Sequence, residues 1–134
     1  MPDISILLWA AALAASPAPA DPLAGRWHGT SLCQVKASAC RDEEAVYYFV
    51  PRSGGGYTVT MDKIVAGVEV EMGPLDVTFA PATGLLTGVT HDRRGAPASW
   101  SFTRHGDRLS GRLVTDGGTL FRLIELRREP APAR

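Results

Sequence analysis

The last third of the chain, residues 99–128, places the strongest constraint on its fold. It consists of three short segments rich in aromatic and branched residues, separated by only two joints. The joints are His105-Gly106 and Asp116-Gly117-Gly118, residue types that accept the positive φ of a tight hairpin turn. Segments of this kind, joined this tightly, predict a meander of neighbouring antiparallel strands. The rest of the chain must then extend this sheet or close it.

The preceding part of the chain continues the pattern of short extended segments broken by turn residues. In residues 68–72, valines and Met72 alternate with glutamates, which indicates a sheet with one dry and one wet face. Gly67 before this segment is either a hairpin turn or a bulge that bends one long strand. Gly73-Pro74 after it predicts a turn. Outside residues 4–15, no stretch shows a helical period. One further extended segment begins at Arg26, and four others cover residues 45–50, 57–64, 75–79 and 85–90.

These segments predict an all-β fold of eight or nine strands, arranged as an up-and-down antiparallel β-barrel. A barrel removes the exposed edges that an open sheet would present. The alternative is a two-sheet β-sandwich. The alternation assigns one set of side chains to the barrel interior: Val59, Met61, Val68, Val70, Met72, Leu75, Val77, Phe79, Trp100, Phe102, Leu109 and Leu113.

The N-terminal residues read as a targeting segment. Residues 4–15 are an apolar run, shorter than the roughly 20 residues that a helix needs to cross a bilayer. Ala18-Pro19-Ala20 supplies the small residues that a signal peptidase prefers, although Met1-Pro2-Asp3 lacks the usual basic residue. We therefore expect a signal peptide at 1–20, one barrel domain at 21–128 and a disordered tail at 129–134. An uncleaved apolar N-terminal helix is the alternative. The expected location is exported, periplasmic or secreted, with no stable membrane span after signal removal.

The chain has only two cysteines, Cys33 and Cys40. In an exported protein an even number of cysteines indicates a disulfide. A zinc site would need more ligands, and only His28 lies nearby in the sequence. We expect a disulfide that staples the first loop, and no metal site.

Neither the charge nor the motifs indicate catalysis. Fourteen basic residues balance fourteen acidic ones, so the chain has no strong positive electrostatic field that would favour binding of a nucleic acid. His28, His91 and His105 lie in no pattern that defines a nucleophile and its base, and Gly-x-Ser-x-Gly is absent. The three glycines at 54–56 are followed by an alternating strand rather than a phosphate-binding helix. We therefore expect no enzymatic activity, no catalytic residues, no cofactor and no nucleic-acid partner.

Gly25-Arg26-Trp27 resembles the Gly-x-Trp motif that opens the first strand of lipocalins and related calycin barrels. In that family the tryptophan closes the bottom of the barrel, and an arginine from near the end of the last strand packs over it. The resemblance implies that Trp27 closes the barrel here. It further implies that Arg127 or Arg128 covers the indole ring in a cation–π contact.

The resemblance also implies that a small apolar ligand binds inside the barrel. The dry faces of residues 68–72 and 75–79 then suggest a set of ligand-binding residues: Val70, Val77, Phe79, Trp100 and Phe102. An eight-stranded barrel either fills its interior with side chains or holds one small ligand. The alternative function is therefore a non-catalytic structural or interaction module of the cell envelope with a filled core. The presence of an internal cavity distinguishes the two.

Overall fold

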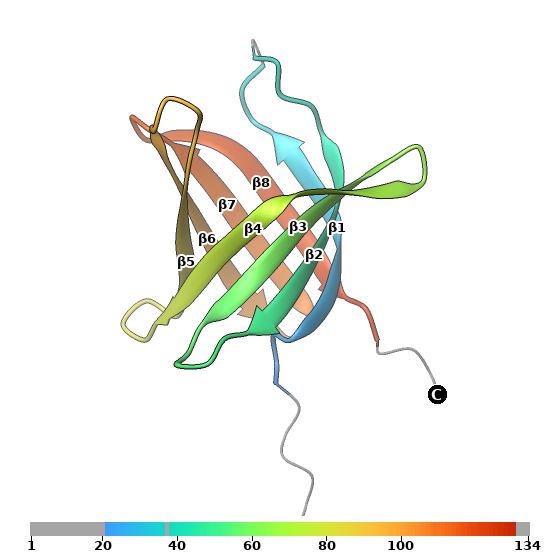
Figure 1. Cartoon of the computed structure of the whole chain (residues 1–134), viewed down its shortest axis with the longest axis vertical. Coiled ribbons are helices and arrows are strands. Elements are labelled where there is room, and N and C mark those ends of the chain that lie inside the picture. The colour runs from blue at the N-terminus through green and yellow to red at the C-terminus, as the bar shows by residue number, and fades with distance from the viewer. Residues whose placement is uncertain (1–20, 37, 131–134) are drawn as a thin grey trace, which may run out of the picture.

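A computed structural model describes residues 21–36 and 38–130 of the chain (Figure 1). The predicted signal segment 1–20 and residues 131–134 of the predicted tail lie outside the described residues. Within the described part of the chain, no helix has the length and apolar character needed to cross a membrane.

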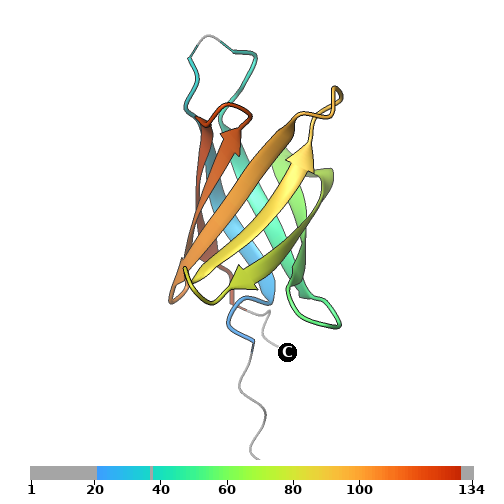
Figure 2. The ribbon, with the colours of Figure 1, turned by 90° about the vertical axis from the view of Figure 1, so that its left-hand side faces the viewer.

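Eight antiparallel strands form one closed barrel in which each strand pairs with its neighbours in sequence. The closure comes from the pairing of the first strand with the last, and both views show the strands tilted around a common axis (Figures 1 and 2). This confirms the predicted up-and-down barrel and excludes the two-sheet sandwich. The strands are β1 (Gly25–Cys33), β2 (Glu43–Pro51), β3 (Tyr57–Val65), β4 (Val68–Ala80), β5 (Leu85–His91), β6 (Pro97–His105), β7 (Arg108–Thr115) and β8 (Thr119–Arg128).

The predicted meander of residues 99–128 corresponds to β6, β7 and β8, and its joints are the predicted hairpin turns. Gly106, Gly117 and Gly118 all have positive φ. Gly67 also lies in a turn rather than a bulge, because Val65 pairs directly with Val68 across it. Ala66 and Gly67 both have positive φ, 50° and 80°, as a two-residue type I′ turn requires.

The predicted turn at Gly73-Pro74 was wrong, because both residues lie inside the 13-residue strand β4. The register shifts there: Met61 of β3 faces Gly73, whereas Asp62 faces Glu71, so Met72 is an extra residue. Such a bulge bends the strand and reverses its alternation. Segments 68–72 and 75–79 are consequently one strand with a bulge, and the barrel has eight strands.

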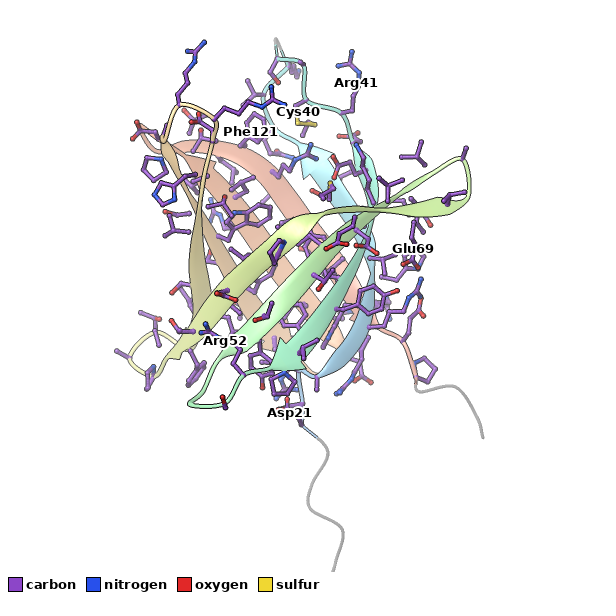
Figure 3. The ribbon with its side chains drawn as sticks, in the orientation of Figure 1. Asp21, Cys40, Arg41, Arg52, Glu69 and Phe121 are labelled. Atoms are coloured by element: carbon purple, nitrogen blue, oxygen red, sulfur yellow. A yellow bond between two sulfur atoms is a disulfide. The ribbon has the colours of Figure 1, made fainter. Side chains whose placement is uncertain are left out.

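Aromatic side chains fill the middle of the barrel interior and its lower end, which is the end near Asp21 in Figure 3. The ring of Phe49 lies edge-on to those of Trp27 and Phe102, at centroid distances of 6.2 and 5.8 Å. Gly111 makes room for Phe102, because a Cβ at this position would lie 2.7 Å from the phenyl ring. Aliphatic residues complete this core, chiefly Val59, Leu75, Val77, Leu86, Leu109, Ile124 and Leu126.

Four residues predicted to point into the interior are exposed instead. Val68 and Phe79, for example, are 62% and 57% exposed, and Val70 and Met72 are also exposed. For the three residues at positions 68, 70 and 72, the reason is the length of the β3–β4 hairpin. The β3–β4 hairpin continues past the barrel as a projecting arm (Figure 1), so its residues have no opposite wall to pack against. We call this arm, residues 62–72, the lip. Phe79 lies at the other end of β4, beside the β4–β5 turn.

The outer face of the lip is tied to the neighbouring strands through Glu69, labelled in Figure 3. Its carboxylate accepts hydrogen bonds from the Arg26 guanidinium at 2.5 Å and from the Tyr48 hydroxyl at 2.7 Å. Val46 and Asp62, which pair on adjacent strands, are both buried. These contacts fix the lip relative to the barrel.

Candidate functional site

The lower end of the barrel is plugged by Trp27 and the segment that precedes β1. Trp27 is fully buried, and its Nε1 donates a hydrogen bond to the carbonyl of Leu23 at 2.9 Å. The Arg128 guanidinium lies 5.8 Å from the centre of the indole ring. It also donates hydrogen bonds to the carbonyls of Pro22, Asp21 and Ala24. Arg127, the other arginine considered from the sequence, is exposed and pairs with His28 across the β1–β8 ladder.

Asp21 anchors this plug from below. Its carboxylate accepts hydrogen bonds from the amides of Leu23 and Ala24 and from the hydroxyl of Tyr57, the last at 2.7 Å. Burial alone would raise the pKa of the Asp21 carboxyl, but these hydrogen bonds and Arg128 lower it on balance. Burial and the bond to Asp21 raise the pKa of Tyr57 to about 12. The lower end is therefore sealed by packed and hydrogen-bonded groups.

The upper end contains an open cavity of about 470 Å³, which we call the cup. Its apolar wall includes an indole, a phenol ring, two thioethers and a leucine. Both β4 and β5 border the cup, and their ladder covers only the pairs from Thr78 to Ala80. Above these pairs, each of the two strands contributes its own residues to the rim. The full lining is Glu43, Tyr47, Met61, Met72, Gly73, Pro74, Thr90, His91, Trp100, Leu113 and Arg122.

An ion pair between Arg122 and Glu43 lies in the cup, and it is largely buried. The guanidinium is 3.2 Å from the Glu43 carboxylate, and the two side chains are only 12% and 16% exposed. Arg122 also donates hydrogen bonds to the carbonyls of Ser31 and Arg41. Because the two charges compensate each other, this part of the cup carries no net charge.

Two further polar groups of the cup are fixed. Burial, together with the nearby Glu43 carboxylate, raises the pKa of Tyr47, so its phenol stays protonated at neutral pH. Trp100 donates a hydrogen bond from Nε1 to the Thr90 hydroxyl at 2.8 Å. The indole ring is thereby held in one orientation in the wall.

The structure does not bring the five suggested ligand-binding residues together. Trp100 is a buried core residue that also lines the cup, whereas Val77 and Phe102 belong to the core and do not line the cup. Phe79 borders a separate groove of about 500 Å³ near the plugged end, which Phe102 and Arg104 also line. Val70 lies on the lip.

The charged pair of the cup was not predicted from the sequence. Arg122 lies two residues before Ile124, which is buried in the core. Along a strand, residues two apart share a face, so Arg122 occupies an inward position. A charged residue at an inward-facing position of a strand is the sequence signal by which Arg122 could have been found.

The predicted disulfide is confirmed: Cys33 and Cys40 are bonded, with Cα atoms 6.0 Å apart. The bond closes the β1–β2 loop at the upper end of the barrel, where Figure 3 labels Cys40 and Arg41. The Asp42 carboxylate accepts a hydrogen bond from the amide of Cys33 at 2.8 Å. Since the carbonyl of Arg41 accepts a hydrogen bond from Arg122, the stapled loop and the cup are directly connected.

The three histidines occupy separate places. His28 lies on the outer face, 2.8 Å from the Glu44 carboxylate. His91 is on the rim of the cup, and His105 ends β6. Among the residues described, no group of three or more histidine, cysteine or acidic side chains is placed to hold a metal ion.

Glu129, the first residue of the predicted disordered tail, has a defined place in the structure. Its amide donates a hydrogen bond to the carbonyl of Arg26 at 2.9 Å. Its carboxylate forms an ion pair with Arg26 and lies 3.5 Å from Nδ1 of His28. The ordered chain therefore extends past residue 128.

Compared with known proteins, the chain matches no protein-family model and no curated protein sequence. The closed eight-stranded antiparallel barrel is compatible with a calycin fold, and the resemblance to lipocalins rests on the Gly25-Arg26-Trp27 motif.

Proposed function

We propose that this protein is an exported, non-catalytic carrier or sensor that binds a small, mostly apolar molecule in the cup. One observation carries the proposal: the barrel is plugged at one end, and at the other it holds an open, largely apolar cavity. The volume of about 470 Å³ falls within the usual range of about 300–1,000 Å³ for small-molecule sites. The separate positions of the three histidines support binding without catalysis.

The lining favours a ligand with a compact apolar part and few polar groups. Tyr47, Met61, Trp100 and Leu113, which are core residues at most 8% exposed, line the cavity with aromatic, thioether and aliphatic atoms. Thioether side chains adapt to ligands of different shape. The charged pair is already satisfied within the protein, so it gives no reason for a ligand to carry a charge deep in the cup.

Binding can be tested with the neutral apolar fluorophore N-phenyl-1-naphthylamine. We expect saturable binding that quenches Trp100, and the difference between wild type and Trp100→Phe isolates this signal. Met72→Trp should obstruct the cup and weaken binding about tenfold or more. Phe79→Trp is the matched control, because Phe79 is also an exposed β4 residue but lies at the plugged end. Equal affinities of the two tryptophan variants would contradict the proposed site.

Export is supported by the apolar segment before Asp21 and by a disulfide, a bond that persists in oxidising compartments. Expression of the full chain in a bacterial host, followed by intact-mass measurement of the periplasmic and medium fractions, tests this. The expected mass lacks residues 1–20. A folded product that retains them would contradict cleavage before Asp21.

An interaction module of the cell envelope is the second candidate function. The filled lower core and the exposed apolar residues of the lip favour it. If the fluorophore fails to bind and Met72→Trp leaves every measured property unchanged, this candidate replaces the carrier.

A further inference from the structure

We propose that the ligand of the cup is an anionic amphiphile, with its apolar tail in the cup and its charged head outside, held by Lys63 on the lip. This inference rests on the proposed function. It adds the chemical class of the ligand, its orientation and one residue that determines specificity.

The lining of the cup is continuous with one face of the lip. Met61 lines the cup, and Lys63 follows it by two residues on the same face of β3. Across the hairpin, Lys63 pairs with Val70, and Val65 pairs with Val68. Paired residues of adjacent strands share a face. The inner surface of the barrel therefore continues outward from the cup onto this face of the lip.

This exposed face of the lip is mostly apolar. Val65, Val68 and Val70 are all at least 41% exposed, and Met72 joins them to the rim of the cup. Four exposed side chains are far fewer than the roughly 20–30 residues that each partner contributes to a stable protein interface. A small molecule that emerges from the cup is the occupant that fits an apolar strip of this size.

Charge is compensated inside the cup but not on this face of the lip. Inside the cup, Arg122 is compensated by Glu43. Among the described residues, no ion pair involves Lys63. The two glutamates of the lip, Glu69 and Glu71, alternate with the valines and so point to its other face, where Arg26 binds Glu69. A head group at the mouth of the cup thus meets an unpaired ammonium, which favours a carboxylate, sulfate or phosphate.

The test compares three ten-carbon probes that differ only in the head group: decanoate, 1-decanol and decyltrimethylammonium. Calorimetric titration of the full chain at neutral pH and low salt should give an order of affinity that follows head-group charge. An ion pair near the surface corresponds to an effect of about 1.5- to 5-fold. We expect decanoate to bind about threefold more tightly than decanol and the ammonium compound to bind most weakly. This preference should shrink in about 0.5 M salt because of screening.

Substitutions of Lys63 test whether this residue causes the preference for the anionic head group. Lys63→Gln should make decanoate and decanol bind equally, and Lys63→Glu should reverse the order of decanoate and the ammonium compound. Lys36→Gln is the matched control, because Lys36 is the only other lysine and lies in the stapled loop away from the lip. It should leave all three affinities unchanged.

The outcomes separate the two proposals. If the probes bind, Met72→Trp blocks them, and the head group or Lys63 has no effect, the anionic class is overturned while the cup remains the binding site. A preference for decanoate that survives Lys63→Glu also overturns the assignment to Lys63. If none of the three probes binds but the naphthylamine fluorophore does, the anionic amphiphile is overturned while the cup remains the binding site. If the fluorophore also fails to bind, both proposals fail.

Discussion

Removing the indole of Trp27 is expected to destabilise the barrel more than any other single truncation at its plugged end. The side chain is fully buried, lies edge-on to Phe49 and is covered by Arg128. Trp27→Ala deletes this ring and the hydrogen bond from Nε1 to the carbonyl of Leu23. The segment that closes the barrel then loses its main contact with the core.

The magnitude follows from these two losses. Emptying a buried aromatic site costs about 3–5 kcal/mol, including the cavity that remains. The lost hydrogen bond adds about 1 kcal/mol. The sum of about 4–6 kcal/mol is comparable with the whole stability of a small domain, about 5–15 kcal/mol. Trp27→Phe keeps most of the apolar volume and loses the hydrogen bond, so it should cost about 1–2 kcal/mol.

Urea unfolding followed by far-UV circular dichroism measures both variants. With a slope of about 2 kcal/mol per molar urea, Trp27→Ala should lower the midpoint by about 2–3 M and Trp27→Phe by about 0.5–1 M. Trp27→Phe should also leave the affinity of the cup for the naphthylamine fluorophore unchanged, because the cup lies at the opposite end of the barrel.

A loss below 1 kcal/mol for Trp27→Ala would refute the packing argument, since it would mean that the ring contributes little to closure. A changed fluorophore affinity in Trp27→Phe would instead refute the independence of the two ends. Both measurements use the same protein preparations.

Three further perturbations test the rest of the fold. A Cys33→Ser/Cys40→Ser variant should lose about 2.5 kcal/mol, the loop-entropy value for a sequence separation of seven residues, and an unchanged urea midpoint would argue against this. Asp62→Asn should stabilise the protein at pH 7, because burial, with a second carboxylate nearby, raises the pKa of Asp62. The Asp62 carboxyl therefore contributes its full stability only below its ordinary pKa of 3.8, and this contribution is lost as the pH rises through the raised pKa of the folded state. The free energy of unfolding of Asp62→Asn should consequently depend less on pH in that range. Parallel curves of unfolding free energy against pH for the variant and the wild type would contradict this. Gly111→Ala should cost about 1–3 kcal/mol, because the new methyl group meets the packed ring of Phe102, and a neutral effect would mean that the core yields easily.

Much of the fold follows directly from the sequence. Alternation places residues on one of two faces, and glycines that accept positive φ mark the hairpins, so local chemistry alone predicts an antiparallel meander. The disulfide is equally local, because its two cysteines lie in one loop. The Gly25-Arg26-Trp27 motif indicated a plugged end, and the structure selects Arg128 rather than Arg127 as the residue over the ring.

The tertiary structure decided the rest, because alternation specifies which face a residue occupies but not where the opposite wall ends. Val70 shares its face with the lining of the cup, yet it is exposed because the lip extends beyond the barrel. The bulge at Met72 depends on the register between β3 and β4, which no single segment encodes. Arg122 and Glu43 are 79 residues apart in sequence, and only closure of the barrel brings them together in the cup. The sequence by itself determined most of the strands and turns, whereas closure of the barrel and the register of β3 with β4 determined which apolar residues became core, cup or lip.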